Sequence, residues 1–278
     1  MIKLISLDID GTLLDGQGKL SKNNLEAIQT ASRRGIHIII NSGRPLVAMV
    51  NLLETLMLIE PVITLTGSLI LEKTSHAGWR ELKSFPISQS VFAPIFPVVQ
   101  ANQLSTFFLT RNHDYVHHAR TNAIYIQWFE DLMKRNDFTG YENLGVSPLS
   151  DYIHLELPVY KLMFCSDLPE EIHTAYQELA SLHLPGLLVE SSSDETVEIH
   201  DDGAGKKQAI EFLCRRMGIQ RDEVMALGDH ESDFSLIEWA GVGAIMGNAQ
   251  TTLKSIAPLV APSNDRDGVA EMINAYAL

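Results

Sequence analysis

Residues 5–14 read ISLDIDGTLL, and this stretch decides the fold of the chain. An apolar run that is typical of a buried strand ends there in two aspartates, Asp8 and Asp10, and then in Gly11. Burying a carboxylate without a partner is costly, so two of them at a strand end require an explanation. An Asp-Gly turn is one explanation, and a metal ion or a covalent reaction is another. Asp8 and Asp10 alone do not decide between these two explanations.

Strands and helices alternate outward from this stretch. In the amino-terminal part, Ser21 is expected to cap the first helix, Gly35 to end it and Pro45 to begin the second. The strands expected there are residues 4–8, 37–41 and 61–65. The carboxyl-terminal part predicts strands at 224–227, 242–246 and 259–261, and helices at 206–217, 234–240, 251–256 and 268–277. This order predicts an α/β fold with a doubly wound, mostly parallel sheet, a Rossmann-like core whose ligands bind beyond the carboxyl ends of the strands.

The order of expected strands and helices in residues 83–187 differs from that in the parts on either side. Strands are expected here at 106–110, 115–119 and 160–166, and helices near 124–135 and 169–182. Two further strands, at 187–189 and 197–199, lie near the return to the first part. We therefore expect residues 83–187 to form an inserted α+β cap domain, and residues 1–82 and 188–278 to form one core domain.

The composition excludes several classes of protein. The 278 residues carry 21 Lys and Arg against 35 Asp and Glu, a net charge of −14, which argues against a nucleic-acid partner. Two distant cysteines, Cys165 and Cys214, do not form a disulfide framework, which fits a reducing cytoplasm. The amino terminus lacks the layout of a signal peptide, and the apolar runs are too short to span a bilayer. A cytoplasmic protein without a membrane partner is expected.

Four motifs follow one another along the chain. They are Asp8-Ile9-Asp10-Gly11-Thr12, Ser42-Gly43-Arg44, Lys206 at a helix start, and Gly228-Asp229-His230-Glu231-Ser232-Asp233. In this order, and with the inserted cap, the chain resembles the haloacid-dehalogenase-like superfamily, specifically its Cof-type phosphatases. The resemblance covers essentially the whole chain and includes the tail segments 246–249 and 264–270.

The two aspartates of the first motif suit phosphoryl transfer. That reaction needs an in-line nucleophile, charge neutralisation and positioning more than elaborate covalent chemistry. Asp8 is the candidate nucleophile, which forms an aspartyl phosphate, and Asp10 is the candidate general acid and later base. The family resemblance implies the same two roles.

The resemblance also implies a Mg²⁺ ion. Its ligands would be a carboxylate oxygen of Asp8, the backbone carbonyl of Asp10 and a carboxylate oxygen of Asp229. Asp233 lies one helical turn beyond Asp229, so it can face the same site and orient the metal or Lys206. Capping of a helix is the ordinary alternative for both Asp229 and Asp233.

A phosphate site is implied beside the metal. The residues that would contact phosphate are Ile9 and Gly43 through their amides, and Ser42, Lys206 and Ser232 through their side chains. Read locally, Ser42 is a helix cap and Lys206 an exposed lysine, and only the family pattern favours the binding role. Ser232 stands where the family often carries Asn, and its shorter side chain puts that contact in doubt.

Together these residues predict a Mg²⁺-dependent phosphatase that hydrolyses small phosphomonoesters, such as sugar phosphates, beneath a substrate-selecting cap. The partner would be a small phosphorylated metabolite, and the protein a monomer or homodimer. A phosphotransferase or phosphomutase shares the first half-reaction, so the motifs do not separate it from a phosphatase. A non-catalytic sensor of a phosphorylated metabolite is also open, because His230 and Ser232 depart from the family pattern. A zinc site is disfavoured, since the ten histidines show no pair with ligand spacing and cysteine partners.

Overall fold

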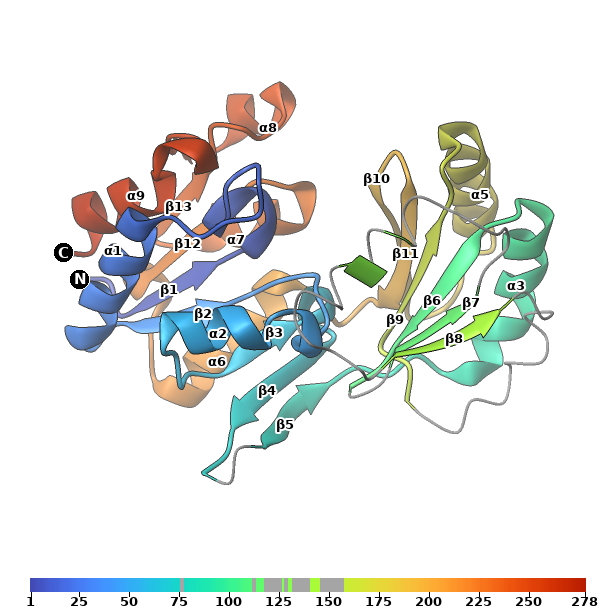
Figure 1. Ribbon diagram of the computed structural model, residues 1–278, viewed down its shortest axis with the longest axis horizontal. Coiled ribbons are helices and arrows are strands. Elements are labelled where there is room, and N and C mark those ends of the chain that lie inside the picture. The colour runs from blue at the N-terminus through green and yellow to red at the C-terminus, as the bar shows by residue number, and fades with distance from the viewer. Residues whose placement is uncertain (76–77, 112–113, 118–126, 128–129, 132–140, 146–157) are drawn as a thin grey trace. The chain divides into compact units, whose positions relative to one another are not determined.

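The chain forms two compact units in a computed structural model (Figure 1). The structure describes residues 1–75, 78–111, 114–117, 127, 130–131, 141–145 and 158–278. The core unit comprises Met1–Gly43, Leu52–Lys83 and Gly205–Leu278, and the inserted unit comprises Arg44–Asn51 and Ser84–Ala204. Among the residues described, no helix has both the length and the apolar character needed to cross a membrane.

A five-stranded parallel sheet forms the centre of the core unit. Its order is β14-β13-β12-β1-β2, so β1 is flanked on both sides, and all four of its residues are buried. Leu4 pairs with Val224 on one side and with His37 on the other. The strands are β1 (Leu4–Leu7), β2 (His37–Ile40), β12 (Val224–Gly228), β13 (Val242–Ile245) and β14 (Leu259–Val260). The predicted doubly wound, mostly parallel sheet is confirmed, and the end of β1 at Asp8 lies between the ends of β2 and β12.

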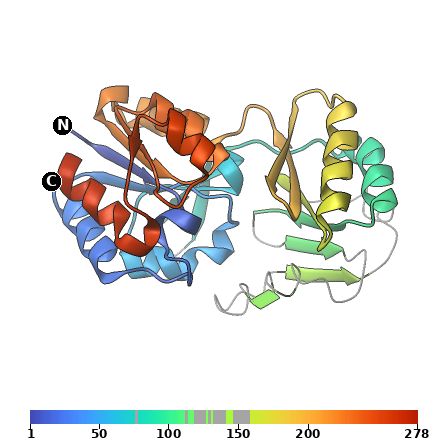
Figure 2. The same cartoon turned by 90° about the horizontal axis from the view of Figure 1, so that it is seen from above.

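Helices pack around this sheet in two groups. The core unit contains α1 (Lys22–Arg33), α2 (Val50–Leu56), α6 (Lys206–Met217), α7 (Glu231–Trp239), α8 (Thr251–Ile256) and α9 (Gly268–Tyr276), with α2 beginning in Arg44–Asn51. Apolar residues of α6 and α7 pack with Leu4 and Ile39 of the sheet. Helices α1 and α9 lie side by side (Figures 1 and 2). Ser21 caps α1 as predicted, because its hydroxyl accepts the amide of Asn24 at 3.1 Å.

A short antiparallel sheet follows β2 in the chain. It has the order β3-β4-β5, and a parallel bridge between Asn41 and Ile63 links β3 to the end of β2. Its strands are β3 (Val62–Thr64), β4 (Leu69–Lys73) and β5 (Trp79–Ser84). Only β3 was predicted. The sequence of β5, WRELKS, is mostly polar and none of its residues is fully buried, so it offers little hydrophobic pattern.

The inserted unit contains a six-stranded sheet in the order β10-β11-β9-β6-β7-β8. Side chains of helices α3 (Phe92–Ala101) and α5 (Pro169–Ser181), among them Phe92 and Ile172, pack with Phe108 and Phe164 of the sheet. The strands are β6 (Ser105–Leu109), β7 (Asp114–His117), β8 (Tyr141–Gly145), β9 (Lys161–Cys165), β10 (Leu187–Ser193) and β11 (Thr196–Asp201). Helix α3 escaped prediction because Pro94 and Pro97 interrupt its sequence pattern.

One predicted boundary is corrected. The core was expected to resume at residue 188, yet β10 and β11 form a hairpin that pairs with β9 and so belong to the inserted unit. The return to the core therefore lies between Ala204 and Gly205. Antiparallel pairing decides this, because the hairpin extends the inserted sheet beyond β9. The helix expected near 124–135 falls mostly outside the described residues.

Candidate active site

Three carboxylates and one lysine meet at the carboxyl edge of the parallel sheet. Asp8 follows β1, Asp229 follows β12, Asp233 lies in the first turn of α7, and Lys206 is the first residue of α6. Oxygen atoms of the three carboxylates lie within 4.8 Å of one another. The Lys206 Nζ donates to Asp8 Oδ1 at 2.9 Å and to Asp233 Oδ1 at 2.7 Å. We call Asp8, Lys206, Asp229 and Asp233 the acidic cluster.

Asp8, Lys206 and Asp233 are buried and Asp229 is half-buried, and burial shifts the pKa values of this cluster. Burial raises the pKa of Asp8 to about 8; Lys206 opposes this shift, and the neighbouring carboxylates add to it. Burial and Asp233 raise the pKa of Asp229 to about 6. Burial alone would lower the pKa of Lys206, but Asp233 and Asp8 hold it above its ordinary value. The lysine stays charged, and three carboxylates crowd around it.

This charge imbalance bears on metal binding. One lysine does not balance three carboxylates; burial is the main reason that the pKa values of Asp8 and Asp229 are raised, and repulsion between the carboxylates adds to the shift. A hard divalent cation with oxygen ligands, such as Mg²⁺, would relieve it, so the donor set fits that ion. The side chain of Asp10 is exposed and is not one of these donors, and that its backbone carbonyl binds the metal stays a prediction.

Asp233 connects two parts of the site. Its Oδ2 accepts the amides of Asp229 at 3.3 Å and His230 at 3.2 Å, while its Oδ1 accepts Lys206. The side chain thus caps α7 and also accepts a bond from Lys206, and that it orients the lysine for the reaction stays a prediction. A Cβ at Gly228 would lie 2.2 Å from the Cγ of Asp233, so this close approach requires glycine.

The turn after β1 contacts Asp229 directly. Ile9–Leu13 forms a single π-helical turn, in which Gly11 has a φ of 72°. A Cβ on Gly11 would lie 2.1 Å from Asp229 Oδ2, and the Thr12 hydroxyl donates to Asp229 Oδ1 at 3.1 Å. Sequence reasoning did not give Thr12 a role, although it belongs to the first motif.

The remaining predicted phosphate contacts lie near the same edge. Ile9 is buried and follows Asp8 in the chain, and Ser42 and Gly43 follow β2, the neighbour of β1. The backbone amide of Ser42 donates to Ile63 O at 3.0 Å, which fixes the chain after β2. Ser232 is half-buried in the first turn of α7. That these residues contact phosphate stays a prediction.

Two features that hold Lys206 were missed. Asn41 is buried, and its Nδ2 donates to the carbonyl of Lys206 at 3.1 Å. Thr66 has a left-handed φ of 57°, and a Cβ at Gly67 would lie 2.4 Å from Gly205 O. The unusual turn before β4 therefore packs against the backbone where α6 begins. Nothing in the sequence around Thr66-Gly67-Ser68 links this segment to Lys206.

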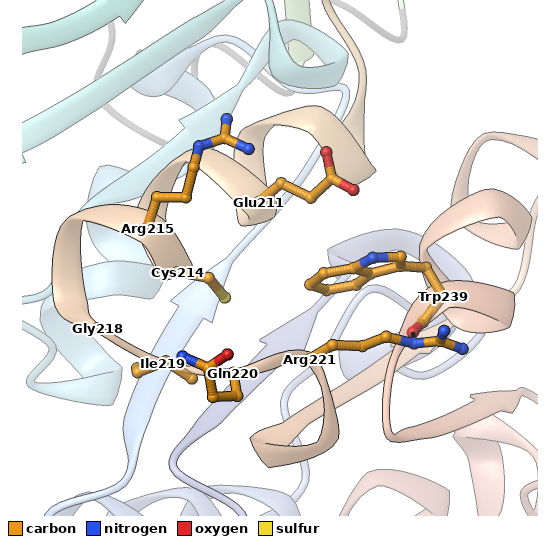
Figure 3. A pocket seen from close by; sticks show the side chains of 8 residues that line it. All are labelled: Glu211, Cys214, Arg215, Gly218, Ile219, Gln220, Arg221 and Trp239. Atoms are coloured by element: carbon orange, nitrogen blue, oxygen red, sulfur yellow. Dashed lines mark hydrogen bonds between the residues drawn. The ribbon is translucent and has the colours of Figure 1, made fainter.

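A cavity of about 360 Å³ lies elsewhere in the core unit, at the carboxyl end of α6 (Figure 3). It is lined by Glu211, Cys214, Arg215, Gly218, Ile219, Gln220, Arg221 and Trp239. None of these residues belongs to the acidic cluster, and none was predicted to act in the site. Burial also raises the pKa of the Cys214 thiol to about 11, so this thiol is protonated and unreactive at neutral pH.

Comparison with known proteins gives a consistent result. Residues 5–273 match a family model described as haloacid dehalogenase-like hydrolase. The chain is 26% identical to the phosphatase YwpJ of Bacillus subtilis, over 98% of this chain and 99% of that protein. It is 28% identical to the 5-amino-6-(5-phospho-D-ribitylamino)uracil phosphatase YcsE of the same organism, over 100% of this chain and 96% of that protein. A solved haloacid dehalogenase-like hydrolase from Bacteroides thetaiotaomicron superposes with a TM-score of 0.82, at 27% identity, with 99% of each chain covered.

Proposed function

Because the chain belongs to the haloacid dehalogenase-like hydrolases, we propose that it is a Mg²⁺-dependent phosphatase that cleaves small phosphomonoesters through an aspartyl phosphate on Asp8. The observation that carries this proposal is the buried contact of Asp8 with Lys206, beside Asp229 and Asp233. A buried carboxylate held by a lysine at the carboxyl end of a central strand is placed to attack a bound phosphoryl group.

The reaction has two balanced steps. A carboxylate oxygen of Asp8 attacks phosphorus, the bond from phosphorus to the ester oxygen breaks, and Asp10 gives its proton to the leaving alcohol. A water molecule then attacks the phosphorus of the aspartyl phosphate, and Asp10 takes a proton from that water. The bond from phosphorus to the Asp8 oxygen breaks, which regenerates the Asp8 carboxylate and releases inorganic phosphate. The exposed side chain of Asp10 suits this exchange with the leaving group and water.

The groups around Asp8 compensate the negative charges of the carboxylates and the phosphate ester. Lys206 is held by Asp233 and offers its positive charge to Asp8 and to the phosphoryl oxygens. Asp8 and Asp229, with the Asp10 carbonyl, would hold Mg²⁺, which when bound offsets the repulsion between the carboxylate and the phosphate ester. Ser42, the amides of Ile9 and Gly43, and Ser232 would donate hydrogen bonds to the phosphoryl oxygens.

The inserted unit is proposed to act as the cap that selects the leaving group. Relatives include proteins named as 5-amino-6-(5-phospho-D-ribitylamino)uracil phosphatases, whose substrate is a small phosphorylated metabolite. Sugar phosphates and similar small phosphomonoesters are therefore the first substrates to test, ranked by kcat/KM. We also expect a cytoplasmic location, and a monomer or homodimer.

The experiment uses purified protein, an aryl phosphate and Mg²⁺. We expect release of inorganic phosphate, its loss in EDTA, and its loss in Asp8→Asn with the fold retained. Asp222→Asn serves as the matched control, because Asp222 is an exposed aspartate of the same unit. Equal turnover by Asp8→Asn and wild type would refute the role of Asp8. Release of phosphate without an added acceptor would exclude an obligate phosphotransferase, and absence of turnover on the whole substrate panel would favour the sensor.

A further inference from the structure

The backbone carbonyls of the turn after β1 accept hydrogen bonds from three asparagine side chains. Asn24 lies near the start of α1, 11 positions from its acceptor, whereas Asn248 and Asn264 lie in the tail segments 246–249 and 264–270. The bonds run from Asn24 Nδ2 to Leu13 O at 3.2 Å, from Asn248 Nδ2 to Gly11 O at 2.8 Å and from Asn264 Nδ2 to Leu14 O at 2.9 Å. The proposed chemistry uses none of these asparagines.

The geometry of the turn explains why it needs outside donors. Its closing bond runs from Leu14 N to Ile9 O at 3.0 Å. Asp10 and Gly11 have non-helical backbone angles, so the carbonyls between them and Leu14 are not arranged for a regular helical ladder. Buried backbone carbonyls need partners, and the side-chain amides of Asn24 and Asn264 supply them for Leu13 and Leu14. The bond from Asn248 to Gly11 lies at the surface.

The asparagines are themselves held in place. Asn248 Oδ1 accepts the amide of Asn264 at 3.0 Å, and Asn24 Oδ1 accepts the amide of Ala270 at 2.9 Å. Each of these two side chains is thus fixed at both its oxygen and its nitrogen. The tail of the core unit thereby braces the turn that carries Asp10.

Gly11 contacts both Asn248 and a residue of the acidic cluster. Its carbonyl accepts Asn248, and its Cα lies so close to Asp229 that a Cβ would collide with the carboxylate. A shift of Gly11 therefore changes the spacing between the turn and Asp229, and with it the direction of the Asp10 carbonyl and side chain.

We propose that Asn248 is a positioning residue of this site, which acts by holding the Gly11 carbonyl and so the approach of the turn to Asp229. This proposal rests on the proposed function. Asn24 and Asn264 are buried and also support the fold, whereas Asn248 is exposed. Substitution of Asn248 therefore costs little burial, and its effect on the turn can be measured separately from stability.

The test compares Asn248→Asp with Asn274→Asp. The first substitution keeps the shape and the acceptor for the Asn264 amide, but places a carboxylate oxygen against the Gly11 carbonyl. The second makes the same charge change on the exposed side of α9. With an aryl phosphate and saturating Mg²⁺, kcat of Asn248→Asp should fall about tenfold or more, while KM changes by less than about threefold. The control should keep the kcat of wild type.

A readout independent of activity accompanies the kinetics. Hydrogen exchange of a peptide covering residues 9–14 should speed up in Asn248→Asp and in a second variant, Asn248→Ala, but not in Asn274→Asp. Exchange in residues 206–217 should not change. Unchanged exchange at 9–14, or kcat within about twofold of wild type in both Asn248 variants, would overturn the proposal. A wild type without activity would refute the proposed function instead, and the exchange data would still decide whether Asn248 holds the turn.

Discussion

Replacement of Lys206 by Met should destabilise the protein strongly, because it leaves buried carboxylates without their cation. The Lys206 Nζ contacts Asp8 at 2.9 Å and Asp233 at 2.7 Å, and the lysine side chain is 4% exposed. Removing one partner of a buried ion pair costs about 3–5 kcal/mol. We expect the lower end, about 3 kcal/mol, since Asp8, whose pKa is about 8 in the folded protein, is already largely protonated at neutral pH.

Lys207 provides the matched control. It is the next residue of the same helix, its side chain is 33% exposed, and it approaches Glu211 at 4.0 Å. Lys207→Met should cost about 0.5 kcal/mol or less, as exposed pairs contribute little. Urea unfolding in EDTA, followed by circular dichroism, measures both variants. With an m value of about 3 kcal/mol/M, the midpoint of Lys206→Met should fall by about 1 M.

The loss of unfolding free energy in Lys206→Met should also depend on pH. The pKa of Asp8 in the folded protein is about 8, above its ordinary value, so the stability linked to its protonated form is present at about pH 4 and lost as the pH rises through about 8. Without Lys206 this pKa rises further. The difference between wild type and Lys206→Met should therefore be larger at about pH 9 than at about pH 5.5. The explanation would be wrong if Lys206→Met and Lys207→Met lost equal unfolding free energy, or if the loss in Lys206→Met did not change with pH.

Three further predictions concern single residues. Gly11→Ala should abolish most activity, because its Cβ would lie 2.1 Å from Asp229 Oδ2, whereas Gly18→Ala, with a similar φ of 73° and open space around it, should cost only stability; phosphate release and a melting curve separate the two. Thr12→Val removes the donor to Asp229 Oδ1 and should raise the Mg²⁺ concentration that gives half-maximal rate, and an unchanged concentration would contradict this. Burial raises the pKa of Asp114 to about 7, so its contribution to stability is present below about pH 4 and lost as the pH rises through about 7. In urea titrations the free energy of unfolding of Asp114→Asn should therefore rise relative to that of wild type between about pH 5 and pH 8. A constant difference between the two proteins over this range would contradict the prediction.

Local sequence signals predicted the elements that carry the acidic cluster. Helix α6 has the bounds expected from Lys206 and from Gly218, which adopts the left-handed conformation of a helix end. The rule that ligands bind beyond the carboxyl ends of parallel strands placed Asp8 and Asp229 at one edge, where their carboxylates are indeed close.

Long-range contacts could not be predicted in the same way. The bond from Asn248 to Gly11 joins residues 237 positions apart, and nothing in the sequence around either one signals it. Asn41 looks like the end of a strand, and its bond to the Lys206 carbonyl depends on how α6 packs on the sheet. The hairpin of β10 and β11 was assigned to the wrong domain because a strand pattern predicts a strand but not its partner.

The proposed reaction requires that Asp8 becomes phosphorylated during turnover. The most direct measurement is mass spectrometry of peptides from protein quenched in acid while it hydrolyses an aryl phosphate with Mg²⁺. We expect one phosphoryl group on the peptide that contains Asp8, and none on that peptide in Asp8→Asn. Steady release of phosphate from a wild-type protein whose phosphoryl group appears on another residue, or on none, would contradict it.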